Sequence, residues 1–130
     1  MPGIDECLRE AMALPGARGA SLVDWTSGLA LGTAGDSPVG DHETTAAETA
    51  ELARSAAEFD SFTAEGEGPG GEPPVEDLIL TTRAGYHVLR FVETSFDSSV
   101  FLHLWLDRDS GNLALARLRL RDLAERLVLG

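Results

Sequence analysis

The sequence contains no lysine, since all ten of its basic residues are arginines. A lysine is needed for the P-loop that holds nucleotide phosphates, for Schiff-base chemistry and for catalysis by a lysine general base. We therefore exclude all three for this chain. Any active site would have to be built from side chains of other types.

Cysteine is nearly absent as well, and no apolar run reaches the roughly 18 residues that span a bilayer. The one cysteine, Cys7, has no partner for an internal disulfide, which agrees with a reducing compartment. The first residues, Met1–Glu6, are acidic where a secretory signal would be basic. We expect a cytoplasmic protein with one domain spanning residues 1–130.

Basic side chains are also scarce in the middle of the sequence. Between residues 35 and 77 there are twelve acidic residues and one arginine, Arg54, in a chain whose net charge is −12. Binding to phosphates requires the opposite charge. The charge pattern therefore predicts no nucleic-acid partner and no anionic membrane, and favours a solvated surface that can also steer a basic partner.

Two segments resemble cofactor or metal motifs, but neither meets the full requirements of such a site. Gly66–Gly71 matches G-x-G-x-x-G, but a helix is predicted before it and a strand after it, the reverse of a dinucleotide site. Asp107–Asn112 begins like a calcium loop, yet Leu118 holds the twelfth position, where a bidentate carboxylate is required. We predict a flexible linker at the first segment, a helix cap at the second, and no cofactor or metal.

Candidate catalytic residues are isolated too. His87 and His103 fall on consecutive predicted strands, where they can approach each other, but no cysteine or paired carboxylate completes a zinc set. No serine lies in a G-x-S-x-G sequence. Cys7 lies on the apolar face of the first predicted helix, as a small core residue does. We predict partly buried, hydrogen-bonded histidines and a protein that is not an enzyme.

Hydrophobic periodicity predicts eight elements in the order α-β-β-α-β-β-β-α. The fold class is α+β: a five-stranded, mainly antiparallel sheet with helices on both faces. Both alternating sets of the last strand are largely apolar, which places that strand in the middle of the sheet. A flexible Gly/Glu/Pro loop is predicted at about residues 63–74. The predicted helices are 4–12, 41–62 and 113–127, the last capped by Asp109–Ser110, and the predicted strands are 20–25, 29–31, 75–82, 86–93 and 99–107.

The second predicted helix has an apolar arc that is wider than one contact needs. Plotted at 100° per residue, its alanines form one stripe and larger residues form a neighbouring stripe, with acidic side chains opposite. The alanine stripe is Ala46, Ala50, Ala53 and Ala57; Leu52 and Phe59 belong to the neighbouring stripe; Glu48, Glu51 and Glu58 are the acidic residues. Small side chains permit another backbone, either a sheet or a partner helix, to approach closely.

Five segments together resemble bacterial members of the roadblock (dynein light chain) family. They occur in the family's order and together span nearly the whole chain, although each segment is only five to eight residues long. The segments are GASLVD at 19–24, SGLAL at 27–31, VEDLILTT at 75–82, YHVLR at 86–90 and NLALAR at 112–117.

This resemblance implies a homodimer in which the third strands pair edge to edge and the second helices pack together. The wide apolar arc and an unprotected edge at residues 75–82 are features that such a dimer would use. The implied interface residues are Ala46, Ala50, Ala53, Ala57, Leu52, Phe59, Val75, Leu78 and Leu80. The resemblance also implies a small Ras-like GTPase as partner, to be regulated or localised, with Glu48, Glu51 and Glu58 as candidate contacts.

A second hypothesis is a small-molecule sensor domain of profilin-like or PAS-like topology. It requires a ligand cavity lined by aromatic residues such as Trp25, Tyr86 and Trp105. Gene context would discriminate the two hypotheses: an adjacent GTPase gene favours the GTPase partner, and an adjacent sensor kinase alone favours the sensor.

Overall fold

The element order is the one predicted from the sequence. A computed structural model describes residues 3–62, 74–92 and 99–127, so most of the predicted loop at 63–74 and the link at 94–98 lie outside the described residues. The elements are α1 (Ile4–Met12), β1 (Ala17–Asp24), β2 (Leu29–Gly35), α2 (His42–Glu58), a short 3-10 helix η1 (Asp60–Phe62), β3 (Asp77–Thr81), β4 (Gly85–Val92), β5 (Val100–Asp107) and α3 (Leu113–Arg126).

The five strands form one antiparallel sheet in the order β2-β1-β5-β4-β3. β5 lies at its centre, and seven of its eight residues are buried. This confirms the prediction that a strand with apolar residues on both alternating sets belongs in the middle. β2 and β3 are the two edges.

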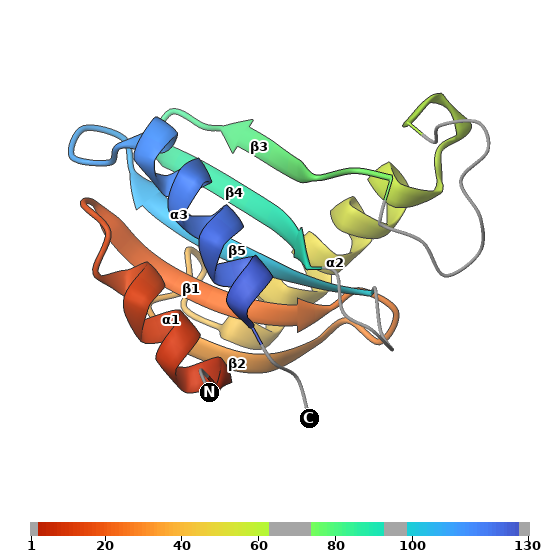
Figure 1. Cartoon of the computed structure of the whole chain (residues 1–130), viewed down its shortest axis with the longest axis horizontal. Helices are drawn as coiled ribbons and strands as arrows, with labels where there is room; N and C mark the ends of the chain where they lie inside the picture. The colour runs from red at the N-terminus through yellow and green to blue at the C-terminus, as the bar shows by residue number, and fades with distance from the viewer. Residues whose placement is uncertain (1–2, 63–73, 93–98, 128–130) are drawn as a thin grey trace.

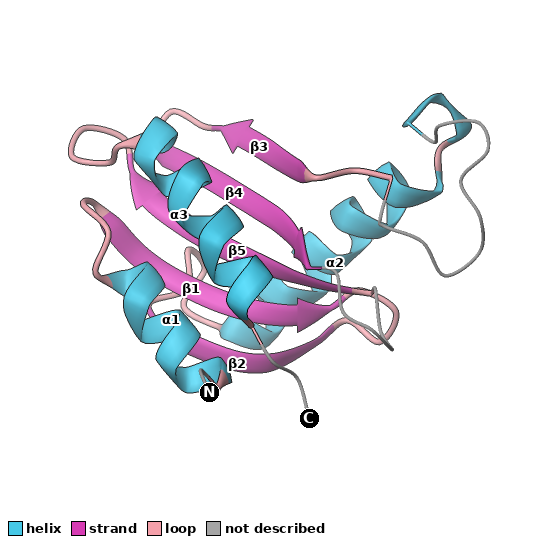
Figure 2. Cartoon of the chain, viewed as in Figure 1, coloured by secondary structure: helices cyan, strands magenta, loops and turns pink. Residues whose placement is uncertain are grey.

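Helices cover both faces of the sheet, as predicted (Figures 1 and 2). α1 and α3 lie on one face, above a core of Leu, Val and Ala side chains that includes Leu8, Leu104 and Leu120. α2 crosses the other face, where Phe101 and Leu89 are buried beneath its alanines. Among the helices of the described residues, none has the length and apolar character required to span a bilayer.

The connection between β1 and β2 is the polar turn that the sequence predicts. The Thr26 N–H donates to Asp24 Oδ1 at 2.9 Å, and the Leu29 N–H donates to Ser27 Oγ at 3.3 Å. Gly28 closes the turn with φ of +77°, a left-handed conformation that favours glycine.

The predicted cap of the last helix is wrong. Asn112 is the N-cap residue, and its Oδ1 accepts from the Leu115 N–H at 3.0 Å. Asp107, at the end of β5, instead accepts from both the N–H and the hydroxyl of Ser110, at 3.0 and 2.9 Å. Ser110 is thus held in the preceding turn and is not free to cap the helix.

Several predicted boundaries also move. β1 begins at Ala17, three residues before the predicted start, and β2 continues to Gly35, four residues past the predicted end, because its residues pair with β1. α2 ends at Glu58, because Phe59 has extended backbone with ψ of 130°, and residues 60–62 form the separate turn η1. β3 begins at Asp77, two residues after the predicted start, although the Phe91 N–H still donates to the Glu76 carbonyl at 3.0 Å.

Candidate functional site

α2 begins at a well-formed cap, which fixes its position over the sheet. Asp41 Oδ1 accepts from the Glu43 N–H at 3.1 Å, and the Thr44 hydroxyl donates to Asp41 Oδ2 at 2.7 Å. These hydrogen bonds, that of Thr44 first, hold the pKa of Asp41 below its ordinary value. At the same end, the Ser37 and Thr45 hydroxyl oxygens are 2.7 Å apart, which ties the preceding loop to the helix.

Most of the predicted alanine stripe lies inside the subunit. Ala46, Ala50 and Ala53 are at most 1% exposed and pack against the chain's own sheet. Their small side chains let α2 lie close to the strands, which is one of the two uses that the sequence allowed. These three residues are therefore not on the surface that a partner can touch, and Ala57 is only partly buried.

Two large residues of the neighbouring stripe of α2 are exposed. Leu52 is 40% exposed and Phe59 is 56% exposed. Just beyond the helix, Phe62 is 53% exposed, with its ring centroid 6.3 Å from that of Phe59. Part of the wide apolar arc thus remains available for contact with another molecule.

β3 adds to this apolar surface from the sheet. It hydrogen-bonds to β4 along one edge, and within the described residues no strand pairs with its other edge. Leu80 is 48% exposed, while Val75 and Leu78 are partly buried against the α2-side core. An unpaired strand edge that carries an exposed leucine is a typical site for strand pairing with another chain.

A groove of about 250 Å³ joins the two elements. It brings Leu52 and Leu80, both predicted interface residues, to the same depression, with the predicted partner contact Glu48 at its wall. Its lining residues are Pro38, Val39, Thr45, Glu48, Thr49, Leu52, Leu80, His87 and Leu89. We call Leu52, Leu80, Phe59 and this groove the α2/β3 surface. Glu51 and Glu58 are exposed on α2 outside the groove.

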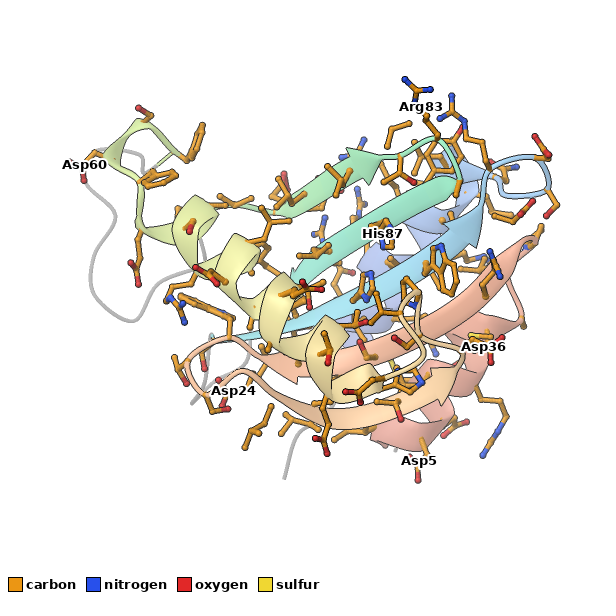
Figure 3. The ribbon with its side chains drawn as sticks, turned by 180° about the vertical axis from the view of Figure 1, so that it is seen from behind. Asp5, Asp24, Asp36, Asp60, Arg83 and His87 are labelled. Carbon is orange, nitrogen blue, oxygen red and sulfur yellow. The ribbon has the colours of Figure 1, made fainter. Side chains whose placement is uncertain are left out.

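The two strand histidines meet, as the sequence predicts. His87 Nδ1 and His103 Nε2 are 2.9 Å apart, so one of them donates to the other. Burial, followed by the charges of His87 and His42, lowers the pKa of His103 to about 3, and burial also lowers that of His87. Figure 3 shows His87 on the sheet to one side of α2. This pair is neutral at physiological pH.

The sequence did not predict that two further side chains, Trp105 and Arg18, stack next to this histidine pair. The His87 and Trp105 rings are stacked with centroids 6.3 Å apart, and the Arg18 guanidinium carbon lies 4.0 Å above the Trp105 ring. A cation over an indole ring is a favourable arrangement. Residues 103 and 105 are two positions apart on β5, so their side chains lie on the same face of the sheet, the one that α2 covers. This alternation was the available signal in the sequence.

The remaining candidates do not assemble into a reactive site. Within the described ranges, no group of three or more His, Cys, Asp or Glu side chains could hold a metal ion. Cys7 is buried in the α1 side of the core, where burial raises its thiol pKa to about 11. A thiol in this state is a poor nucleophile.

The three aromatic residues of the sensor hypothesis lie in separate places. Trp25 packs on Phe91 with centroids 6.4 Å apart, on the α2 face. Tyr86 packs against the core beneath α1 and α3. Trp105 is stacked on His87. None of the three lines any of the grooves that the described residues form with volumes of about 250, 280 and 360 Å³.

Comparison with known sequences finds no match, either among protein-family models or among curated proteins. Comparison with solved structures, in contrast, finds proteins of similar fold. MglB from Myxococcus xanthus is 20% identical, with a TM-score of 0.74 over 94% of this chain and 82% of that one. A structure of MglB with a tetrameric arrangement is also 20% identical, with a TM-score of 0.71 over the same shares.

A third structure carries the name of the fold. The Roadblock/LC7 domain from Streptomyces avermitilis is 19% identical, with a TM-score of 0.67 over 95% of this chain and 93% of that domain. Both chains are thus matched over almost their full lengths, including the five-stranded sheet and the helices on its two faces. The chain therefore has the fold of the roadblock domain.

Proposed function

We propose that this chain is a non-enzymatic homodimer that binds a small Ras-like GTPase and regulates or localises it. The observation that carries the dimer is the α2/β3 surface, where exposed leucines lie beside an unpaired strand edge. Pairing of β3 with β3 of a second copy satisfies the free edge, and Leu52, Phe59 and Leu80 become buried. The tetrameric arrangement of an MglB structure with this fold supports self-association.

Sedimentation equilibrium at micromolar concentration tests the dimer. The wild-type chain should sediment at twice the chain mass, and Leu52→Asp should shift it to the monomer, because a carboxylate in an apolar contact is strongly unfavourable. Leu29→Asp is the matched control, since Leu29 is 64% exposed on the opposite edge strand. A monomeric wild type, or equal dissociation by both variants, would contradict the proposal.

The GTPase as partner is supported by the roadblock resemblance and by the acidic side of α2. Glu48, Glu51 and Glu58 are all exposed, and no basic residue lies in the last turn of the helix. Acidic side chains around an interface accelerate association with a basic partner, and salt screens this effect. We place the GTPase on this side of the homodimer, beside the joined α2 helices.

Binding to small Ras-like GTPases from the same genome tests this partner. The purified chain should bind no GTP, and should change hydrolysis or nucleotide exchange only when its GTPase is present. Glu51→Lys with Glu58→Lys should slow association about tenfold and flatten its salt dependence. Glu125→Lys on α3 is the control, exposed on the other face of the sheet. Failure of every GTPase to bind would leave the dimer proposal standing and remove this one.

A further inference from the structure

A second groove, of about 360 Å³, lies between α3 and the β3–β4 side of the sheet. It is on the face that α1 and α3 cover, opposite α2 (Figure 1), so the function proposed above does not use it. Arginines from one strand and one helix converge in it. The lining residues are Glu76, Asp77, Arg90, Ala114, Arg117, Leu118 and Arg121.

One arginine of the groove is fixed by an ion pair with the strand. Arg117 Nε donates to Asp77 Oδ2 at 2.8 Å, and Nη2 donates to Oδ1 at 3.3 Å. The Asp77 side chain is only 12% exposed, whereas that of Arg117 is 52% exposed. This two-point contact holds α3 against β3 and sets the width of the groove.

The other two arginines have spare hydrogen-bonding capacity. Within the part of the chain that the structure describes, the side-chain Nε of Arg90 is buried and has no hydrogen-bond acceptor. A buried donor without an acceptor is costly, so an oxygen that enters the groove beside Arg90 is favoured. Among the residues that the structure describes, Arg121 has only a long contact with Glu125, at 3.9 Å between exposed side chains.

Apolar surface adjoins these guanidinium groups. Leu118 is 60% exposed and Ala114 is exposed on the same side of α3. The helix also has four arginines against two acidic residues, in a chain of net charge −12. α3 therefore presents basic and apolar side chains together, which complements a ligand that combines a carboxylate with an apolar side chain.

We propose that this groove binds an acidic peptide segment of a partner protein, with its carboxylates at Arg90 and Arg121 and an apolar side chain on Leu118. A peptide fits better than nucleic acid, because Glu76 and Asp77 at the wall repel closely spaced phosphates. A carboxylate on a flexible chain reaches the arginines between these acids. Arg117, already paired with Asp77, positions the helix.

Fluorescence anisotropy with a labelled ten-residue peptide of alternating Glu and Leu tests the proposal. Binding at low salt should weaken about tenfold in Arg121→Gln, which removes one charge-assisted contact. Arg119→Gln is the matched control, since Arg119 lines the separate groove between α1 and α3 and its loss should leave the affinity within twofold. Equal weakening by both variants would show general charge attraction and overturn the proposal.

Four further measurements separate the alternatives. A peptide with Gln in place of Glu should not bind, and inorganic phosphate should not compete below about 10 mM; competition at lower concentrations would show a small-anion site instead. Arg90→Gln should weaken peptide binding as Arg121→Gln does, and circular dichroism confirms that this variant is folded. The Arg90 Nε–H signal in nitrogen-15 NMR spectra should shift on peptide addition. An unchanged signal, or no peptide binding by the wild type, would refute the site.

Discussion

At the scale of the residue, His103 makes stability depend on pH in a defined window. Its pKa falls from 6.5 to about 3 in the folded chain, mainly through burial, and that of His87 is lowered in the same direction. Below pH 6.5 the unfolded chain therefore binds protons that the folded chain does not. The free energy of unfolding should fall as the pH falls, by up to about 1.4 kcal/mol per pH unit from His103 alone.

Urea unfolding between pH 7.5 and 4.5 measures this slope. Asp41 and Asp107 contribute little in that window, because hydrogen bonds, chiefly from Thr44 and Ser110, lower their pKa values below 3.8, and their contribution is lost only at lower pH. His103→Phe should flatten the slope, whereas His42→Gln should keep most of it. A stability that is constant from pH 7 to 5 would show that His103 titrates normally.

At the scale of the element, the alanines of α2 set the distance between the helix and the sheet. Ala50→Leu adds three carbon atoms where no space exists and should cost about 1–3 kcal/mol of unfolding free energy. Ala47→Leu, the same change on the exposed side of the helix, should stay within about 0.5 kcal/mol of the wild type. Denaturant midpoints of the variants and the wild type, compared at equal m-values, measure these changes in unfolding free energy. Equal destabilisation by Ala50→Leu and Ala47→Leu would contradict the close packing of α2 on the sheet.

The same helix shows where prediction from the sequence reaches its limit. The period of the apolar residues placed the helices and the strands, including β5 at the centre, because burial imposes a geometric period on the side chains. It could not distinguish Ala50 in the subunit core from Ala50 at a dimer seam, because a small side chain suits both. Ser110 was mistaken for the cap of α3 because its hydroxyl binds Asp107, a contact with no sequence period.

At the scale of the whole molecule, self-association should couple stability to concentration. If the α2/β3 surface joins two copies, the melting temperature rises with protein concentration, since binding stabilises the folded state by mass action. Leu52→Asp should melt at the same temperature over a hundredfold range of concentration, while Leu29→Asp should retain the dependence. A wild type whose melting temperature is independent of concentration would show that the surface stays uncovered.

The two different faces of β5 also restrict how this strand can align with its neighbours in the sheet. Its residues alternate between two different environments, with Leu102 and Leu104 in the α1/α3 core, and Phe101 and His103 on the α2 face. A slip of one residue against β1 and β4 would exchange these sets. His103 would then enter the apolar core and lose its contact with His87. A central strand that is misaligned by one residue is thus destabilised on both faces at once.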